Sequence, residues 1–344
     1  MRPVLLLLLL LCPRSFAEER TAGPLILPTE NTALFESKGP AFYQVIERDF
    51  KGVKSRPWEG GQWGFVRNPT ETPGGLVYSR FHEGIDIRPL RRAPDGEPLD
   101  SVDAIADGTV VYVNSSPRHS GYGKYIVVEH LWEGCPYYSL YAHLAEIRTS
   151  VGKSVKQGES LACMGYTGPG LDRSRAHLHF EIALMINRQF DRWFESLPTA
   201  KTDPNRHGLY NGMNLNGINV ARYYLALRKD PTLSLPAFLA TEKTYYKVLL
   251  PNKGPLDVVS LYPWLLADSP LKKPASWEVS FSQDGQILRV TPQATPVDKP
   301  TVSWVHPTPV PLALVTKSVL FGKSSAPGLT DYGLRVMNLI GFGN

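Results

Sequence analysis

Three short segments of the sequence contain most of the residues that could carry out chemistry. They are His82-Glu83-Gly84-Ile85-Asp86, Tyr141-Ala142-His143-Leu144 and His177-Leu178-His179-Phe180-Glu181. Together they supply four histidines and one aspartate, which is enough to hold one zinc ion through three ligands and to leave two imidazoles for proton transfer. Each segment alone is a common pattern, so the interpretation depends on their order and surroundings.

The spacing within these segments suits a metal site built on β-strands. Residues two or four apart in a strand point to the same side, so His82 and Asp86 are predicted to share one face, and His177 and His179 to project together. His82, Asp86 and one of the two later histidines give the three ligands of a catalytic zinc ion, which keeps one position for water. Such a site activates water for attack on an amide carbonyl.

The other histidines have no partner at ligand spacing. We therefore predict that they are hydrogen-bonded packing residues: His119, His130, His207 and His306. No C-x-x-C pair is present, so a structural zinc site is not expected. Cys135 and Cys163 remain once a leader containing Cys12 is removed, and they are either one disulfide or two buried thiols.

The elements that must position these residues are predicted to be short strands. The chain has 344 residues with 30 prolines and 29 glycines, a composition that favours loop-rich β structure. Strands are predicted at 109–113, 125–130, 137–143, 161–165 and 176–185. Their close spacing indicates an antiparallel sheet or a barrel-like domain, and therefore a mainly β fold with an N-terminal arm and a mixed α+β C-terminal region.

Four regions are predicted along the chain: a signal peptide (1–17), an N-terminal arm (18–60), a domain that carries the three motifs (61–190) and a C-terminal region (191–344). Arg2, a leucine-rich run and Ser15-Phe16-Ala17 predict export with cleavage after Ala17, to the periplasm or the medium. The apolar run is too short to span a bilayer, and no later segment is long and apolar enough. The formal charge of +5 allows contact with an acidic polymer and does not require nucleic acid.

The outer regions carry no chemical motif, and they give no signal of oligomeric state. Residues 40–50 are predicted to form a short helix with Phe42, Val45 and Ile46 on one face, and the arm either lies across the active groove or is part of the fold. Asn219 is predicted to cap a helix whose apolar positions are Val220, Tyr223, Tyr224 and Leu227. Residues 277–281 and 287–290 are predicted to pair as a hairpin.

The order of the motifs resembles that of the lysostaphin-type (LytM-like, M23) zinc metalloendopeptidases, which cut peptidoglycan peptides. The matching elements occur in the family's order: H-x-G-x-D at 82–86, A-D-G-x-V at 106–110, G-Y-G at 121–123, Y-A-H-L at 141–144, G-x-x-V-x-x-G at 152–158 and H-L-H-F-E at 177–181. The resemblance covers about residues 61–188. It implies a small antiparallel β domain with a groove over the sheet.

The resemblance also implies roles for the five residues. Zinc is expected on His82, Asp86 and His179, and His143 and His177 are expected to be the catalytic pair beside the metal. The implied activity is that of an exported zinc metalloendopeptidase that hydrolyses peptide bonds in peptidoglycan stem peptides or cross-links. Two segments depart from the family pattern, 165–176 and the basic 88–98. Both are predicted to be loops around the groove that affect substrate preference and not metal binding.

Two other functions fit parts of the pattern. A non-catalytic relative could bind the cell wall or activate a partner hydrolase, but such relatives usually lack one of the five residues that this chain retains. A carrier module of the biotinyl or lipoyl type shares the turn pattern around Gly108 and 152–158. That class needs a modified lysine at an exposed hairpin tip, and the predicted export signal argues against it.

Overall fold

The computed structural model describes residues 25–343 except residues 45–48, 51–52 and 55–56. The predicted signal peptide and the predicted helix positions Val45 and Ile46 lie outside the described residues. All strand pairs in the described part are antiparallel, and strands outweigh helices, which confirms the predicted mainly β fold. Within the same residues, none of the helices combines the length and the apolar character that crossing a membrane requires.

The central sheet carries the residues of interest. Its strands follow the order β11-β7-β8-β9-β13-β14, and β5 also pairs with β13. The strands are β5 (Ile85–Ile87), β7 (Gly108–Asn114), β8 (Tyr125–Trp132), β9 (Cys135–Ala142), β11 (Ser154–Val155), β13 (Leu178–Met185) and β14 (Leu215–Gly217). Four of the five predicted strands correspond to β7, β8, β9 and β13, with small shifts at their ends.

Both faces of this sheet are buried, and alternate residues belong to different cores. Along β8, Ile126 and Val128 join the main hydrophobic core, whereas Tyr125 and Val127 join a second, smaller cluster on the opposite face. On β13, His179 pairs in register with Ala142, a member of that smaller cluster. Because directly opposite residues share a face, the period of two places His179 on the side of the smaller cluster.

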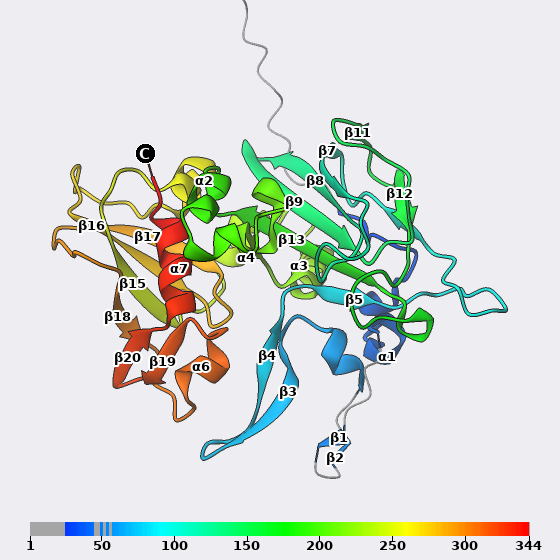
Figure 1. The fold of residues 1–344 in the computed structure, drawn as a ribbon, viewed down its shortest axis with the longest axis horizontal. Helices are drawn as coiled ribbons and strands as arrows, with labels where there is room; N and C mark the ends of the chain where they lie inside the picture. Colours follow the sequence, from blue (N-terminus) through cyan, green and yellow to red (C-terminus); the bar gives the residue numbers. More distant parts are fainter. Residues whose placement is uncertain (1–24, 45–48, 51–52, 55–56, 344) are drawn as a thin grey trace, which may run out of the picture.

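Smaller sheets surround the central one. The fifth predicted strand is β12, in a three-stranded sheet of order β10-β12-β6: β6 (Ser101–Asp103), β10 (Glu146–Ile147) and β12 (Ser160–Cys163). A long hairpin, which extends away from the body in Figure 1, consists of β3 (Gly64–Thr72) and β4 (Gly75–His82). A short pair precedes it, β1 (Asp49–Phe50) and β2 (Val53–Lys54).

The C-terminal region contains a four-stranded sheet of order β17-β16-β15-β18, with α7 packed across it in Figure 1. Its strands are β15 (Tyr246–Pro251), β16 (Ser276–Phe281), β17 (Ile287–Gln293) and β18 (Thr301–Val305), and a hairpin follows, β19 (Leu320–Lys323) with β20 (Ala326–Leu329). The pairing of β16 with β17 places Val279 opposite Val290. The predicted hairpin is therefore confirmed.

The helices are short. They are α1 (Gly39–Phe42), α2 (Phe190–Glu195), α3 (Val220–Lys229), α4 (Leu235–Leu239), α5 (Asp257–Leu261), α6 (Leu312–Val315) and α7 (Asp331–Ile340). Helix α3 starts as predicted: Asn219 Oδ1 accepts a hydrogen bond from the Arg222 backbone N–H at 3.1 Å. Its four predicted apolar positions are buried. Helix α1 is shorter than predicted, because Tyr43 adopts an extended conformation and bridges to Ile87.

The C-terminal region is fixed to the central sheet by buried polar contacts. The Tyr262 hydroxyl donates to the Pro136 carbonyl at 2.7 Å and accepts from the Met185 N–H at 2.9 Å. The Asn187 side chain donates to the Leu339 carbonyl at 3.0 Å. Since apolar side chains from both regions also form one continuous core, the central sheet is held from the C-terminal side as well.

Cys135 and Cys163, the two cysteines of the described residues, are free thiols. Cys135 is buried at the start of β9, and Cys163 is partly buried at the end of β12, where its thiol approaches the Glu146 carboxylate at 3.6 Å. Of the two sequence interpretations, the structure therefore supports thiols and not a disulfide, although only Cys135 is fully buried.

The tight packing next to the site generates a stability prediction. A Cβ atom on Gly165 would lie 2.4 Å from the Ala145 backbone nitrogen and 2.8 Å from the His143 carbonyl oxygen. Because both neighbours are backbone atoms, Gly165→Ala should cost about 1–3 kcal/mol and lower the melting temperature by several degrees. Thermal unfolding followed by circular dichroism measures this.

The matched control is Gly121→Ala, because a Cβ atom there would meet nothing within 4 Å. We expect its melting temperature to stay within about one degree of the wild type, as for ordinary surface changes. Equal melting temperatures for the two variants would contradict the packing argument.

Candidate metal centre and groove

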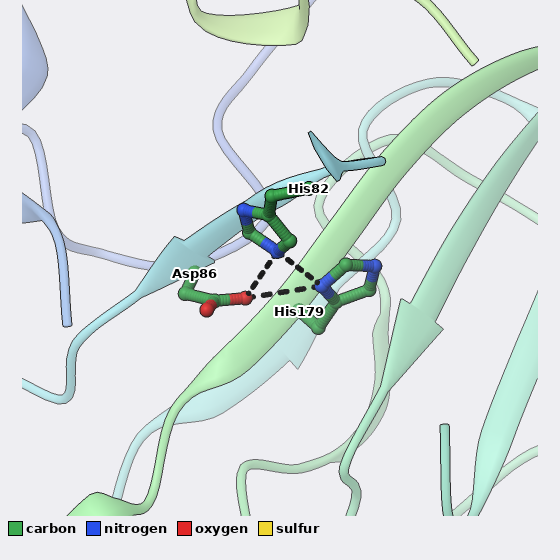
Figure 2. A group of neighbouring side chains, drawn as sticks. All are labelled: His82, Asp86 and His179. Carbon is green, nitrogen blue, oxygen red and sulfur yellow. Dashed lines mark hydrogen bonds and ion pairs between the residues drawn. The ribbon is translucent and has the colours of Figure 1, made fainter. Parts of the chain in front are cut away.

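The structure brings all five predicted site residues together. His82 ends β4, Asp86 lies in β5, and His179 lies in β13. His177 directly precedes β13, and His143 directly follows β9. Figure 2 shows His82, Asp86 and His179 pointing toward one another from β4, β5 and β13. Residues far apart in the sequence meet because β13 pairs with both β5 and β9.

One detail of the prediction was wrong: His82 and Asp86 are not on one continuous strand. Strand β4 ends at His82 and β5 begins at Ile85, with a bend between them. A Cβ atom on Gly84 would lie 2.6 Å from the Phe180 carbonyl oxygen and 2.8 Å from the His179 ring. Glycine is needed at this position because the backbone at Gly84 passes so close to β13 that a larger side chain would clash with it.

Three potential ligand atoms form a compact triangle. The distances are 3.0 Å from His82 Nε2 to Asp86 Oδ1, 3.0 Å from His179 Nδ1 to Asp86 Oδ1 and 3.1 Å from His82 Nε2 to His179 Nδ1. All three residues are buried. Donor atoms that each lie 2.0–2.1 Å from a tetrahedral ion are separated by roughly 3.3 Å, so this donor set fits one small divalent ion such as zinc.

The outer ring nitrogens are already occupied. His82 Nδ1 is 2.7 Å from the Gln62 carbonyl oxygen and must donate to it. His179 Nε2 is 2.8 Å from Glu181 Oε1 and donates its hydrogen to that carboxylate. Each bond fixes the ring and leaves the other nitrogen directed at the triangle. This is the arrangement of metal-ligating histidines, whose second nitrogen is held by a carbonyl or carboxylate.

The electrostatics of the triangle favour a cation. Burial opposes ionisation of Asp86, but the neighbouring His82 and His177 outweigh it and hold the pKa of the carboxyl well below its usual range. Burial lowers the pKa of His82, and Asp86 only partly offsets this. Burial also acts against protonation of His179, but Asp86 and Glu181 raise its pKa to about 9. A proton and a metal ion therefore compete for His179 Nδ1.

Two further residues complete the support of the ligands. The Arg67 guanidinium donates to Asp86 Oδ2 at 2.6 Å and to the Gly60 carbonyl at 2.9 Å, which leaves Asp86 Oδ1 for the triangle. The Tyr122 hydroxyl donates to Glu181 Oε1 at 2.7 Å. Burial, followed by the charge of Glu181, raises the pKa of Tyr122 well above its usual value, so this donor stays protonated. No sequence motif pointed to Arg67.

His143 and His177 lie beside the triangle with a different set of contacts. Their Nδ1 atoms are 2.8 Å from the Thr167 carbonyl and 2.7 Å from the Arg175 carbonyl, so each Nε2 is free of a backbone partner. The ring centroids are 4.7 Å apart. Burial, with His177 and His179 nearby, keeps the pKa of His143 well below its usual value. His143 also has a φ of 62°, a strained conformation that clusters at functional sites.

The five residues lie in an open groove with a volume of about 1220 Å³. Its lining includes residues of the β3–β4 hairpin and residues between 203 and 213 of the C-terminal region. The departing segment 165–176 lines the groove through Pro169, Gly170, Leu171 and Arg175. The other segment that differs from the family pattern, 88–98, contacts segment 165–176: Arg92 donates to the Arg173 carbonyl at 2.7 Å.

The remaining histidines have mixed positions. His130 is a packing residue as predicted, buried and within 2.8 Å of the Asp107 carbonyl. His207 is also buried and hydrogen-bonded to the Tyr112 hydroxyl at 2.8 Å, yet it lines the groove. His119 and His306 are exposed, so the packing prediction was wrong for them. His119 lines the groove, because the loop before β8 reaches its rim.

Residues 25–44 of the arm are not among the residues that line the groove. Among residues 25–44, Phe42 is fully buried and the Gln44 N–H donates to the Asp86 carbonyl at 2.8 Å. This segment therefore packs along the outer edge of β5 and supports Asp86 from the backbone side. In the described residues the arm is part of the fold.

Comparison with known families and proteins agrees with this geometry. The sequence model of the family described as peptidase family M23 matches residues 80–191, which include all five site residues. Peptidoglycan DD-endopeptidase ShyB of Vibrio cholerae is 36% identical over 121 residues, covering 35% of this chain and 24% of its own. Murein hydrolase activator NlpD of Escherichia coli is 37% identical over 122 residues, covering 34% of this chain and 27% of its own.

Two solved structures each match 35% of this chain. The lysostaphin catalytic domain of Staphylococcus simulans is 26% identical with a TM-score of 0.25, covering 35% of this chain and 75% of that one. A zinc-containing peptidase from Vibrio cholerae is 27% identical with a TM-score of 0.23, covering 35% of this chain and 36% of that one. The chain spans about a quarter of the length of the two curated relatives above.

The contacts around the ligands generate a prediction about metal affinity. Arg67→Gln and Glu181→Gln each remove one charged partner of a ligand while leaving all three ligands in place. Because such outer partners orient the ligands, each change should weaken zinc affinity by about 10–100-fold. Competition with a chromophoric chelator measures the affinity.

Two controls bracket this effect. Arg289→Gln changes an exposed arginine of β17 outside the groove and should leave the affinity unchanged. Asp86→Ala removes a ligand and should abolish stoichiometric binding. Wild-type affinity in both Arg67→Gln and Glu181→Gln would show that these contacts do not support a metal site.

Proposed function

Because residues 80–191 form a peptidase family M23 domain, we propose that this protein is an exported zinc metalloendopeptidase that hydrolyses peptide bonds in peptidoglycan. The observation that carries the proposal is the buried triangle of His82, Asp86 and His179 with two further imidazoles beside it. Similarity to a peptidoglycan DD-endopeptidase supports the substrate class. Residues 1–17 supply the export signal, which the intact mass of the exported protein would check.

The proposed metal ligands are His82 Nε2, Asp86 Oδ1 and His179 Nδ1. A zinc ion bound there would act as a Lewis acid, lowering the pKa of a coordinated water and polarising the scissile carbonyl. The hydrogen bonds of His82 to Gln62 and of His179 to Glu181 keep the two ligand nitrogens unprotonated when the metal is bound.

The proposed proton carriers are His143 and His177. In both rings Nδ1 donates to a backbone carbonyl, so the other nitrogen can accept a proton without breaking that bond. The lowered pKa of His143 means that this ring starts neutral and able to accept. A protonated ring can then pass the proton to the leaving amine.

A second function follows from one comparison. The similarity to a murein hydrolase activator is as high as that to the endopeptidase, so a regulator of the cell wall is the alternative. A regulator needs the groove and not proton transfer. The retention of both His143 and His177, with their hydrogen bonds in place, supports catalysis.

The first test is digestion of purified peptidoglycan by the chain that begins at Glu18. We expect new peptide ends, detected by mass spectrometry, that disappear after treatment with a chelator and return when zinc is added. The new ends also identify the bond that is cut. An unchanged peptide profile from protein shown to contain one zinc per chain would favour the regulator.

The second test separates metal binding from proton transfer. His143→Ala should retain zinc, because it removes no ligand, but should lower kcat by about 10²–10⁴-fold. His82→Ala should lose zinc and activity together. Zinc content is measured by mass spectrometry of the metal and turnover by peptide release. Full activity in His143→Ala would exclude it from the reaction.

A further inference from the structure

We propose that the groove selects peptides with a free carboxylate close to the bond that is cut, and that Arg80 recognises this carboxylate. This inference rests on the proposed function, because it names the substrate class of the same groove. Of the two candidate substrates, an uncharged glycine bridge and an acidic peptide cross-link, the inference favours the acidic cross-link.

The charges that line the groove are the first observation. Four arginines line it, and they come from three separate segments: Arg67, Arg80, Arg175 and Arg206. Among the described residues three acidic side chains line it, and one of them is the proposed metal ligand Asp86. A bound divalent ion would add positive charge to the same space. The groove is therefore complementary to an anionic ligand.

The partners of the arginines are the second observation. Arg67 is committed to Asp86, at 2.6 Å. Arg206 pairs with Asp203 at 3.3 Å, and both are exposed. Arg175 donates to the Gly170 carbonyl at 2.8 Å. Exposed Arg80 makes no ion pair with any residue in the described part of the chain. Its charge is thus available to a ligand.

The position of Arg80 is the third observation. It lies two residues before His82 in β4, so both side chains project from the same face of the strand. Two residues of a strand span about 7 Å, which places the Arg80 backbone within reach of a substrate group about two residues from the scissile bond. An extended peptide in the groove would therefore present a nearby carboxylate to this guanidinium.

The cross-strand partner of Arg80 is a second arginine. Arg67 lies directly opposite Arg80 in the β3–β4 register. Like charges in this arrangement repel, and the contact with Asp86 compensates only Arg67. A substrate carboxylate would compensate Arg80 in the same way, through the two parallel N–H···O bonds that a guanidinium offers to a carboxylate.

The test compares two forms of one peptide, a cross-linked peptidoglycan fragment with free carboxylates and the same fragment with those carboxylates amidated. Binding is measured by calorimetry with zinc-loaded protein in a His143→Ala background, so that the peptides are not cut. We expect at least about tenfold tighter binding of the acid, since hydrogen bonds between two charged groups are stronger than those between neutral groups. Adding Arg80→Gln should reduce this preference to less than about twofold.

The controls make each outcome decisive. Arg289→Gln, in the same background, should retain the full preference, and all variants must contain equal zinc. Equal binding of acid and amide, an unchanged preference with Arg80→Gln, or no binding of either peptide would overturn the inference. Cleavage by the chain with His143 intact is recorded separately. If the peptides are not cleaved but the acid is still bound more tightly than the amide, the result contradicts the proposed enzymatic activity and not the recognition by Arg80.

Discussion

The site depends on the contacts of the Asp86 carboxylate with its neighbours. One carboxylate oxygen accepts a hydrogen bond from the Arg67 guanidinium, and the other lies within 3.4 Å of nitrogens of three histidine rings. A buried carboxylate needs such partners, because burial alone would drive it to its neutral form. The surrounding structure supplies them from three segments, β3, β4 and residues 177–179, while Asp86 itself lies in β5. The fold therefore has to bring β3, β4, β5 and β13 to one point before any chemistry is possible.

Strand β13 is the element that meets this requirement. It is buried along its whole length, pairs with β5, β9 and β14, and carries His179 and Glu181 on one face. The opposite face carries Phe180 and Ile182 into the main core. A slip of one residue in its register would exchange these faces and bury the ligands in apolar packing. The extensive core thus fixes the orientation of the candidate metal ligands as well as the stability of the sheet.

The sequence was sufficient for the elements whose signals are local. Alternation and turn residues located β7, β8, β9 and β13, and the side chain of Asn219 located the start of α3. The break between His82 and Asp86 was missed, because it depends on β13 passing 2.6 Å from the position of a Cβ on Gly84. Arg67 and the groove-lining residues between 203 and 213 were missed for the same reason. Their roles arise from contacts between segments far apart in the chain, and no local pattern records such contacts.

The polar groups of the site also bear on the choice between enzyme and regulator. Burying imidazoles costs free energy unless their hydrogen bonds are satisfied. In each of the four buried rings one nitrogen is bound to a carbonyl or to Glu181, and the second nitrogens of His82, His177 and His179 converge on Asp86 Oδ1. A surface that only bound the cell wall would gain nothing from holding these nitrogens toward a single point. A metal ion and a reacting peptide are the partners that would offset the cost. The proposed catalysis would supply both partners, and the arginines that line the groove would then select what enters.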